Sequence, residues 1–162
     1  MDVFNEEFIL FWSALNEFKV KYIMIGGVAT NLHGYQRTTN DIDVWIEDTP
    51  SNRSNLRKAM KQYTGMDYFM IDTMQIIPGW TNFYLNNGFR LDFMVDVKGL
   101  EEFTFDESLS MASIADIEGQ QVPFLHINQL ITSKKAANRS KDQVDVIYLE
   151  KIKELLSNEK NT

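Results

Sequence analysis

Cysteine is missing from this 162-residue chain, and histidine occurs only twice. Without cysteine the chain can form neither a disulfide framework nor a metal site built from thiolates. Two histidines are too few for a zinc centre that is rich in imidazole ligands. These absences exclude the small cross-linked domains and the zinc modules, and they leave a fold that depends on a hydrophobic core.

Long apolar runs are missing as well. No stretch of about 18 uncharged apolar residues occurs, so the sequence predicts no membrane span. The first residues, MDVFNEEF, lack the basic start of a signal peptide. We therefore expect a cytoplasmic protein.

Positive charge is in deficit, with 16 Lys and Arg against 23 Asp and Glu and a net charge of −7. Broad nonspecific binding of nucleic acid needs a basic surface, so this balance argues against it. Hydrophobic residues make up 44% of the chain, which is enough for one domain with a real core. We expect that domain to span residues 1–156 and the tail, residues 157–162, to fray.

A glycine pair follows the first β-rich segment of the chain. Residues 21–25, KYIMI, form a short apolar run that ends at Gly26 and Gly27, and helix-compatible residues follow from Val28 to His33. A strand, a Gly-Gly turn and a helix start can bind an anion, because free N–H groups and the helix dipole point at the ligand. An ordinary strand-to-helix turn would carry the same residues, so this segment alone does not decide between the two interpretations.

Two aspartates alternate with apolar residues shortly afterwards. In DIDVWIE, Asp41 and Asp43 point to one face of a strand, and Ile42, Val44 and Ile46 point to the other. Two carboxylates on one face repel each other unless water or a shared cation lies between them. A solvated face of a sheet would show the same pattern. The glycine pair just before these aspartates favours a site for a metal ion and phosphates.

These two segments together resemble the nucleotidyltransferase fold of the DNA polymerase β superfamily. That superfamily carries a Gly-Gly or Gly-Ser pair and then an Asp-x-Asp or Asp-x-Glu pair, and here residues 28–40 lie between the two halves. The string GGVATNLHGYQRTTNDIDV is more specifically similar to the small bacterial branch that includes AbiEii-like proteins. The residues that match this branch are Gly26, Gly27, Ala29, His33, Gly34, Arg37, Thr39, Asp41, Ile42 and Asp43. The resemblance implies an α+β fold with a mixed β-sheet flanked by helices and with helices at the C-terminus.

The resemblance also implies a third carboxylate on a later strand. In residues 89–97, FRLDFMVDV, both Asp92 and Asp96 fall on the polar face of the alternation. Asp92 is the preferred candidate, since a central position aligns best with neighbouring strands, whereas Asp96 lies near the strand end. A solvated strand position remains the alternative for either residue.

The C-terminal part of the chain carries a second match. Lys134, Arg139 and Asp142 fit the closing pattern of the family, which implies that Lys134 reaches the triphosphate and that Asp142 lies near the site. From the residues alone, Lys134 could be a solvated helix lysine. Asp142 could serve the helix dipole in a first turn that a Ser140-x-x-Gln143 capping box opens.

Other residues of the first motif have alternatives of their own. Arg37 could bind a phosphate, or it could hold the loop by binding Asp41 or a backbone carbonyl. The resemblance places Thr39 with the nucleotide-binding residues. His33, at a helix end before a glycine, is interpreted as structural rather than as a base.

The remaining segments are predicted to be scaffold. An amphipathic helix is expected over residues 3–18, with Phe4, Phe8, Phe11, Trp12, Leu15 and Phe18 on its apolar face. A second helix should begin with Thr49 as its cap and Pro50 in its first turn. Short strands are expected at residues 68–71 and 81–85, and a hairpin turn at residues 86–88. A last amphipathic helix should use the apolar residues Val144, Ile147, Tyr148, Ile152, Leu155 and Leu156.

The sequence thus predicts a nucleotidyltransferase that depends on Mg²⁺ or Mn²⁺. Asp41, Asp43 and Asp92 would hold the metal, and Gly26, Gly27, Arg37, Thr39, Lys134, Arg139 and Asp142 would bind the nucleotide. The donor would be a nucleoside triphosphate, first of all ATP, and the acceptor a hydroxyl of a small molecule, protein or RNA. The competing hypothesis is a non-catalytic module of the same fold that acts as a toxin–antitoxin or regulatory partner. Either hypothesis allows a partner protein or a homodimer.

Overall fold

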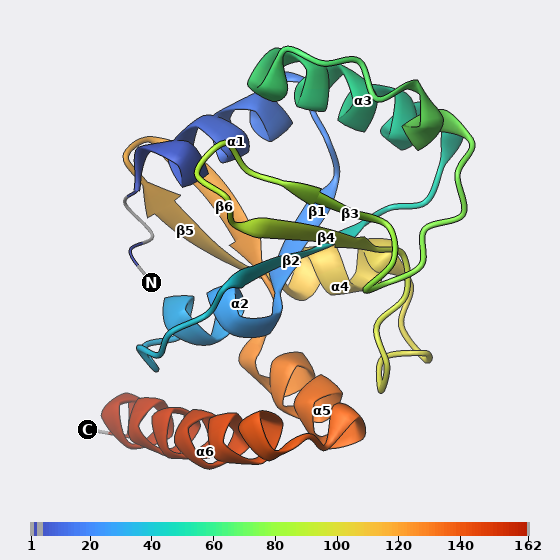
Figure 1. The fold of residues 1–162 in the computed structure, drawn as a ribbon. Coiled ribbons are helices and arrows are strands. Elements are labelled where there is room, and N and C mark those ends of the chain that lie inside the picture. The colour runs from blue at the N-terminus through green and yellow to red at the C-terminus, as the bar shows by residue number, and fades with distance from the viewer. Residues whose placement is uncertain (1, 3–4, 162) are drawn as a thin grey trace.

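The computed structural model describes residue 2 and residues 5–161, and it has a six-stranded sheet with helices on both sides (Figure 1). The strands are β1 (Tyr22–Ile25), β2 (Asp41–Ile46), β3 (Asn82–Tyr84), β4 (Arg90–Met94), β5 (Ser113–Ile117) and β6 (Gln120–Phe124). The helices are α1 (Glu6–Glu17), α2 (Gly26–Leu32), α3 (Pro50–Thr64), α4 (Phe105–Met111), α5 (Ile127–Ala137), α6 (Ser140–Lys160) and the short 3₁₀ helix η1 (Phe69–Asp72).

The sheet is mixed, as the sequence predicts. Its strand order is β3-β4-β2-β1-β6-β5, so β2 and β1 occupy the middle. β2 runs antiparallel to β1 and parallel to β4, whereas β1 runs parallel to β6. The parallel pairing of β2 with β4 brings the Asp-x-Asp strand beside the strand that carries Asp92, although 48 residues separate their first positions in the printed sequence.

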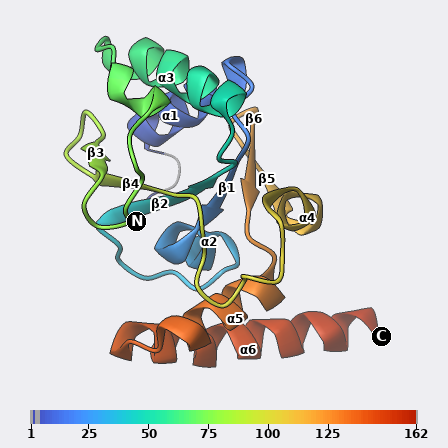
Figure 2. The ribbon, with the colours of Figure 1, turned by 90° about the vertical axis from the view of Figure 1, so that its right-hand side faces the viewer.

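Helices cover the two faces of the sheet unequally (Figures 1 and 2). α1 and α3 lie together over one face, and α2, α5 and α6 lie beyond the other. The apolar face of α1 is buried as predicted, through Phe8, Phe11, Trp12 and Leu15. Phe4, the first residue of that predicted face, lies outside the described residues.

Local sequence signals set several of the element ends. The Thr49 side chain accepts a hydrogen bond from the Asn52 N–H, and Pro50 occupies the first position of α3, so the predicted cap is confirmed. The hairpin turn before β4 is confirmed as well: the Leu85 N–H donates to the Phe89 carbonyl, and Gly88 has a φ of 89°.

The predicted strand at residues 68–71 is wrong, because the structure has the 3₁₀ helix η1 there. Arg53 on α3 donates to the carbonyl of Ile71 at 3.0 Å and to that of Met74 at 2.7 Å. These bonds engage backbone groups that strand pairing would need, and Ile71 is fully buried against the helix. A contact from a distant arginine is not visible in a local alternation pattern.

The last helix forms as predicted but presents a different face to the protein. Asp142, Asp145 and Leu149 of α6 are buried. The apolar residues expected to pack are mostly exposed, namely Val144, Ile147, Tyr148, Leu155 and Leu156. Buried ion pairs, described below, set the rotation of α6 in place of its apolar residues.

α6 continues to Lys160, so the residues expected to fray are helical in this structure as far as that residue, and their fraying in solution stays a prediction. Thr162 lies outside the described residues. Among the described helices, none is both long and apolar enough to cross a membrane.

Candidate functional site

The glycine turn is built around the carboxylate of Asp43. In the sheet register Ile25 pairs with Asp43, so the next residue, Gly26, lies against the Asp43 side chain. Gly26 has a φ of 64°, and a Cβ added to it would overlap the Asp43 Oδ2 atom. Glycine is therefore required here twice, by the backbone conformation and by the close approach of the carboxylate.

The second glycine is packed against Thr39 in the same way. A Cβ at Gly27 would lie 2.7 Å from the Thr39 Oγ1 atom. That hydroxyl donates to the carbonyl of Asp41 at 3.1 Å. Thr39 thus fixes the start of β2 against the start of α2, and in this structure it acts on the backbone of the motif.

Asp43 and Asp92 face each other across two neighbouring strands. They are register partners in the parallel β2–β4 ladder, whereas Asp41 is the partner of Arg90. Burial, then the charges of Asp92 and Asp41, raise the pKa of Asp43 to about 6. A carboxyl whose ionisation is resisted by burial and by like charges gains strongly from a nearby cation.

Asp92, the preferred third carboxylate, is buried and already engaged. Its two carboxylate oxygens both accept from the Gly79 N–H at 3.2 Å. Its Oδ2 also accepts from the Arg90 Nη2 at 3.2 Å. Asp96 lies beyond the end of β4 and is exposed, because the strand predicted to span residues 89–97 ends at Met94.

The three aspartates are neighbours, but they do not converge as metal ligands do. Within the part of the chain that the structure describes, no group of three or more carboxylate or histidine side chains is close enough to hold a metal ion. The donor chemistry itself fits a hard cation such as Mg²⁺, since all the candidate ligands are carboxylate oxygens.

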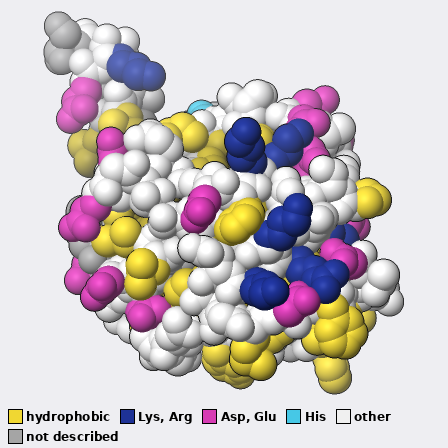
Figure 3. Space-filling model, turned by 90° about the horizontal axis from the view of Figure 1, so that it is seen from above, with side chains coloured by type: hydrophobic (Ala, Val, Ile, Leu, Met, Phe, Trp, Pro, Cys, Tyr) yellow, Lys and Arg dark blue, Asp and Glu magenta, His cyan; other side chains and the backbone are white. Residues whose placement is uncertain are grey.

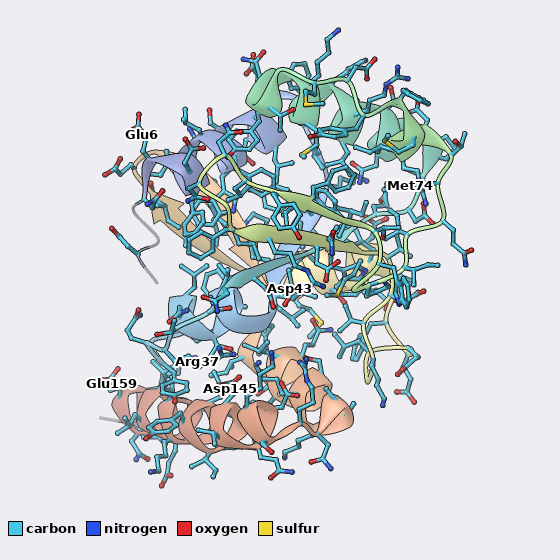
Figure 4. All side chains as sticks on the ribbon, in the orientation of Figure 1. Glu6, Arg37, Asp43, Met74, Asp145 and Glu159 are labelled. Atoms are coloured by element: carbon cyan, nitrogen blue, oxygen red, sulfur yellow. The ribbon has the colours of Figure 1, made fainter. Side chains whose placement is uncertain are left out.

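A cluster of charged side chains, buried except for Arg139 and part of Arg37, joins the first motif to the C-terminal helices (Figure 4). Asp145, with no exposed surface, accepts from Arg37 Nε at 2.7 Å, from Arg37 Nη2 at 2.8 Å and from Lys134 Nζ at 2.7 Å. Asp142 accepts from Arg139 Nε at 2.7 Å and lies 3.7 Å from Lys134 Nζ. The cluster has three cations and two anions, so one positive charge is left over.

Among the predicted alternatives for these residues, one partner, one environment and one helix cap are wrong. Arg37 holds the loop through a backbone carbonyl, as one alternative predicted, since its Nη1 donates to the Thr38 carbonyl at 3.1 Å. Its carboxylate partner is Asp145 and not Asp41. Lys134 is not a solvated lysine, because it is only 5% exposed. Ser140 is not the cap of α6.

The helix cap is Arg139, whose N–H donates to the Asp142 carboxylate at 3.1 Å. Burial alone would raise the pKa of Asp142. The hydrogen bonds from the Arg139 side chain and backbone outweigh it, and the pKa is lowered. Asp142 therefore has the structural role that was one of its two predicted alternatives.

A cleft of about 310 Å³ brings the two halves together. Gly26 and Asp43 lie on its sheet side, and Lys134, Arg139 and Asp142 lie on its helical side. Apolar side chains make up much of the lining, among them Ile25, Pro78, Met94, Val97, Leu130 and Ala137. Asp96 and Lys98 line the cleft as well, so carboxylates and cations both face it, whereas Asp41 and Asp92 are not among its lining residues.

His33 has a structural environment, as interpreted. Its Nε2 lies 2.8 Å from the Leu125 carbonyl oxygen, and its ring meets Phe124 edge-on. Burial lowers the pKa of His33, which keeps the imidazole neutral over a wider range of pH.

Two residues at the site were not singled out from the sequence. Gly79 could not have been found, because only the folded loop brings its N–H to Asp92. The position of Arg90 was predictable, because residues two apart on a strand point to the same face. Arg90 therefore lies beside Asp92 on β4.

Comparison with known proteins identifies the fold and the family of the chain. No curated protein matches the chain at significant similarity. Among solved structures, the lincosamide antibiotic adenylyltransferase LnuA in its lincomycin-bound form is similar, with a TM-score of 0.58 and 16% identity over 91% of this chain and 97% of LnuA. An antigenic nucleotidyltransferase-like protein from Paracoccidioides brasiliensis gives a TM-score of 0.55 and 18% identity over 88% of this chain and 74% of that protein.

The antibiotic-resistance factor ANT(2'')-Ia gives a TM-score of 0.52 and 15% identity over 96% of this chain and 90% of that protein. These likenesses show the α+β nucleotidyltransferase fold. The AbiEii-like branch stays a prediction. A family model matches residues 5–162, and the chain belongs to that family, described as "Nucleotidyl transferase of unknown function (DUF2204)".

Proposed function

We propose that the protein transfers a nucleoside monophosphate from ATP or another nucleoside triphosphate to an acceptor hydroxyl, in a reaction that depends on Mg²⁺ or Mn²⁺. Membership of a nucleotidyl transferase family supports the reaction class. One observation carries the proposal for this chain: the half-buried Asp43 lies between Gly26 and Asp92, and its pKa is raised by burial and by the charges of Asp92 and Asp41 more than the charges of Lys141 and Lys134 lower it.

The metal would be held by Asp41, Asp43 and Asp92, whose carboxylate oxygens fit a hard cation. When bound, a divalent cation supplies neutralisation of the triphosphate charge and a lower pKa for a coordinated hydroxyl. Lys134 and Arg139, on the opposite wall of the cleft, would bind the outer phosphates, and the N–H groups of Gly26 and Gly27 would bind phosphate oxygens.

In the proposed transfer, the acceptor oxygen forms a bond to the α-phosphorus while the bond from that phosphorus to the bridging oxygen breaks. Pyrophosphate leaves, and the hydroxyl proton passes to the Asp92 carboxylate. The residues of this chain contribute mainly position and charge, which is the usual protein contribution to phosphoryl transfer.

The names of the similar structures make ATP the first donor to test. LnuA is an adenylyltransferase, and ANT(2'')-Ia was determined with adenylyl-2''-tobramycin, so both names concern adenylyl groups on antibiotics. We propose small hydroxylated molecules as the first acceptors to test, with proteins and RNA after them. The cytoplasmic location and a toxin–antitoxin partner stay predictions from the sequence.

The test is incubation with each of four nucleoside triphosphates labelled on the α-phosphate, with Mg²⁺ or Mn²⁺ and a cell extract as the source of acceptor. We expect one labelled product with the wild type and none with Asp43→Asn. Asp106→Asn, the same chemical change at an exposed position on α4, should label the product as the wild type does. Equal labelling by both variants would contradict the proposal.

A further inference from the structure

Asp92 has a cationic partner of its own strand in the metal-free protein. Arg90 lies two residues before it on the same face of β4, and Arg90 Nη2 donates to Asp92 Oδ2. Among the described residues, no other basic side chain is hydrogen-bonded to Asp92. This positive charge therefore offsets part of the repulsion between Asp92 and its register partner Asp43.

The ion pair is a weak one by the standards of this molecule. Arg90 makes a single hydrogen bond of 3.2 Å to Asp92, whereas Arg37 binds Asp145 through two nitrogens at 2.7 and 2.8 Å. The Arg90 Nε is buried and has no hydrogen-bond partner. A buried N–H without an acceptor is destabilising. The Arg90 side chain therefore loses less free energy on separating from Asp92 than an arginine in a bidentate pair would lose on separating from its carboxylate.

The other partner of Asp92 comes from a tight turn over residues 77–81. The Thr81 N–H donates to the Ile77 carbonyl at 2.9 Å, and the Ile77 N–H donates to the Thr81 hydroxyl at 2.8 Å. This turn presents the Gly79 N–H to both oxygens of Asp92. Arg90 and the turn together occupy the carboxylate that the proposed function assigns to the metal.

We propose that Arg90 is the counter-ion of Asp92 in the metal-free protein and that it sets the affinity for the divalent cation. The metal and the guanidinium compete for one carboxylate, so Arg90 and the Gly79 turn leave Asp92 when the cation binds. The inference rests on the proposed function, because it assumes that Asp92 takes part in metal binding.

The effect of the Arg90 charge on metal affinity can be tested by measuring Mn²⁺ binding, with electron paramagnetic resonance of the free ion. Removing a positive charge next to a cation site strengthens binding of the cation. We expect Arg90→Gln to bind Mn²⁺ about tenfold more tightly than the wild type, a difference of about 1.4 kcal/mol. Arg90→Lys, which keeps the charge, should stay near the wild type.

Arg57→Gln is the matched control, because it removes the same charge from α3, where Arg57 pairs with Asp67 and Asp72 at the surface. Its Mn²⁺ affinity should equal that of the wild type. An Arg90→Gln variant that binds Mn²⁺ no more tightly, or less tightly, overturns the inference while leaving the proposed function intact. A wild type that binds no Mn²⁺ overturns both.

The release of the turn at residues 77–81 from Asp92 can be measured separately, by tryptophan fluorescence of the wild-type protein. Trp80, next to Gly79, is 84% exposed, whereas Trp12 and Trp45, the other two tryptophans of the chain, are 1% and 3% exposed. Quenching of tryptophan fluorescence by acrylamide therefore reports mainly on Trp80. We expect saturating Mg²⁺ to change the quenching constant of the wild type and to leave that of Trp80→Phe unchanged. Quenching that is the same with and without Mg²⁺ would contradict release of the turn.

Discussion

At the scale of single residues, the site depends on one close fit between Gly26 and Asp43. The Gly26 backbone lies in the left-handed region, and the Asp43 carboxylate occupies the space where any other residue would place its Cβ. The negative charge of Asp92 repels the same carboxylate and raises its pKa. A glycine and a half-buried carboxylate are thus parts of one arrangement, and each can be tested by a single substitution.

Gly26→Ala should destabilise the protein more than a glycine substitution that meets only backbone strain. Gly65 has a φ of 80°, and a Cβ added to it would meet no atom within 4 Å, so Gly65→Ala is the matched control. We expect the control to lose about 1–2 kcal/mol from left-handed strain. Gly26→Ala should lose about 1–3 kcal/mol more from the overlap with Asp43. Urea unfolding of both variants measures the difference, and equal losses would show that the Asp43 side chain moves away freely.

Asp43→Asn should change the pH dependence of stability. The pKa of Asp43 is about 6 in the folded protein and 3.8 as a model value, so the folded state holds its proton more tightly. Stability from this group is present below pH 3.8 and is lost as pH rises through about 6. Without metal, the variant should therefore exceed the wild type at pH 8, by an amount on the order of 3 kcal/mol at most.

Chemical unfolding at pH 4 and pH 8 in the presence of a chelator makes the comparison for Asp43→Asn. The two proteins should be closest at pH 4, where the wild-type carboxyl is largely protonated. Asp96→Asn is the control, because Asp96 is exposed and lies past the end of β4. A variant that is less stable than the wild type at pH 8 would mean that the Asp43 charge has a stabilising partner.

At the scale of elements, α6 is attached to the rest of the protein by charge more than by apolar contact, whereas α5 buries Ile127, Leu130 and Ile131 in the core. Asp145 on α6 binds Lys134 on α5 and Arg37 in the loop before β2. Among the apolar residues of α6, only Leu149 is fully buried. The Tyr148 ring stacks on the Tyr35 ring, with 4.1 Å between the ring centroids. The first motif and the C-terminal helices are thus held in register through one buried carboxylate.

Asp145→Asn should therefore weaken the whole protein. The substitution leaves Arg37 without its carboxylate partner and leaves buried Lys134 with only Asp142, at 3.7 Å. Breaking a buried pair in this way typically loses about 3–5 kcal/mol. Glu150→Gln, on the same helix and paired with Lys135 at the surface, should change stability little. Thermal unfolding compares the two variants. A loss in Asp145→Asn no larger than in Glu150→Gln would show that water or a relaxed helix position satisfies the cluster.

Most elements follow from local signals, and the failures have a common cause. The Gly-Gly turn, the Asp-x-Asp strand, the cap at Thr49 and the hairpin turn at residues 86–88 were all visible as patterns over a few residues. The failures at residues 68–71 and on the outer face of α6 come from long-range charged contacts, made by Arg53 and Asp145. A periodic pattern records which residues are apolar, and it does not record which buried charges pair across the chain.

At the scale of the whole molecule, charge is distributed unevenly around a net value of −7. Figure 3, which looks onto the face that α1 and α3 cover, shows most of the visible Lys and Arg side chains in its right half, with acidic side chains among them. The cleft carries both signs of charge, with Asp43 and Asp96 among its carboxylates and Lys98, Lys134 and Arg139 as its cations. A ligand that carries both a metal ion and phosphates would complement both signs of charge in that cleft.

A nucleoside triphosphate with Mg²⁺ should consequently stabilise the protein more than either does alone. The triphosphate is attracted to the cations of the cleft, and Mg²⁺ is attracted to Asp43. Each of the two alone therefore binds only part of the cleft. At about 100 times its Kd the complex should add about 2.7 kcal/mol, which corresponds to roughly 5–10 °C in melting temperature for a domain of this size. Thermal melts with ATP, Mg²⁺, both together and neither provide the comparison. Asp43→Asn should lose the joint effect and Asp106→Asn should keep it. A shift by ATP alone that equals the shift with Mg²⁺ would mean that the nucleotide binds through the cations of the cleft only, without the aspartates.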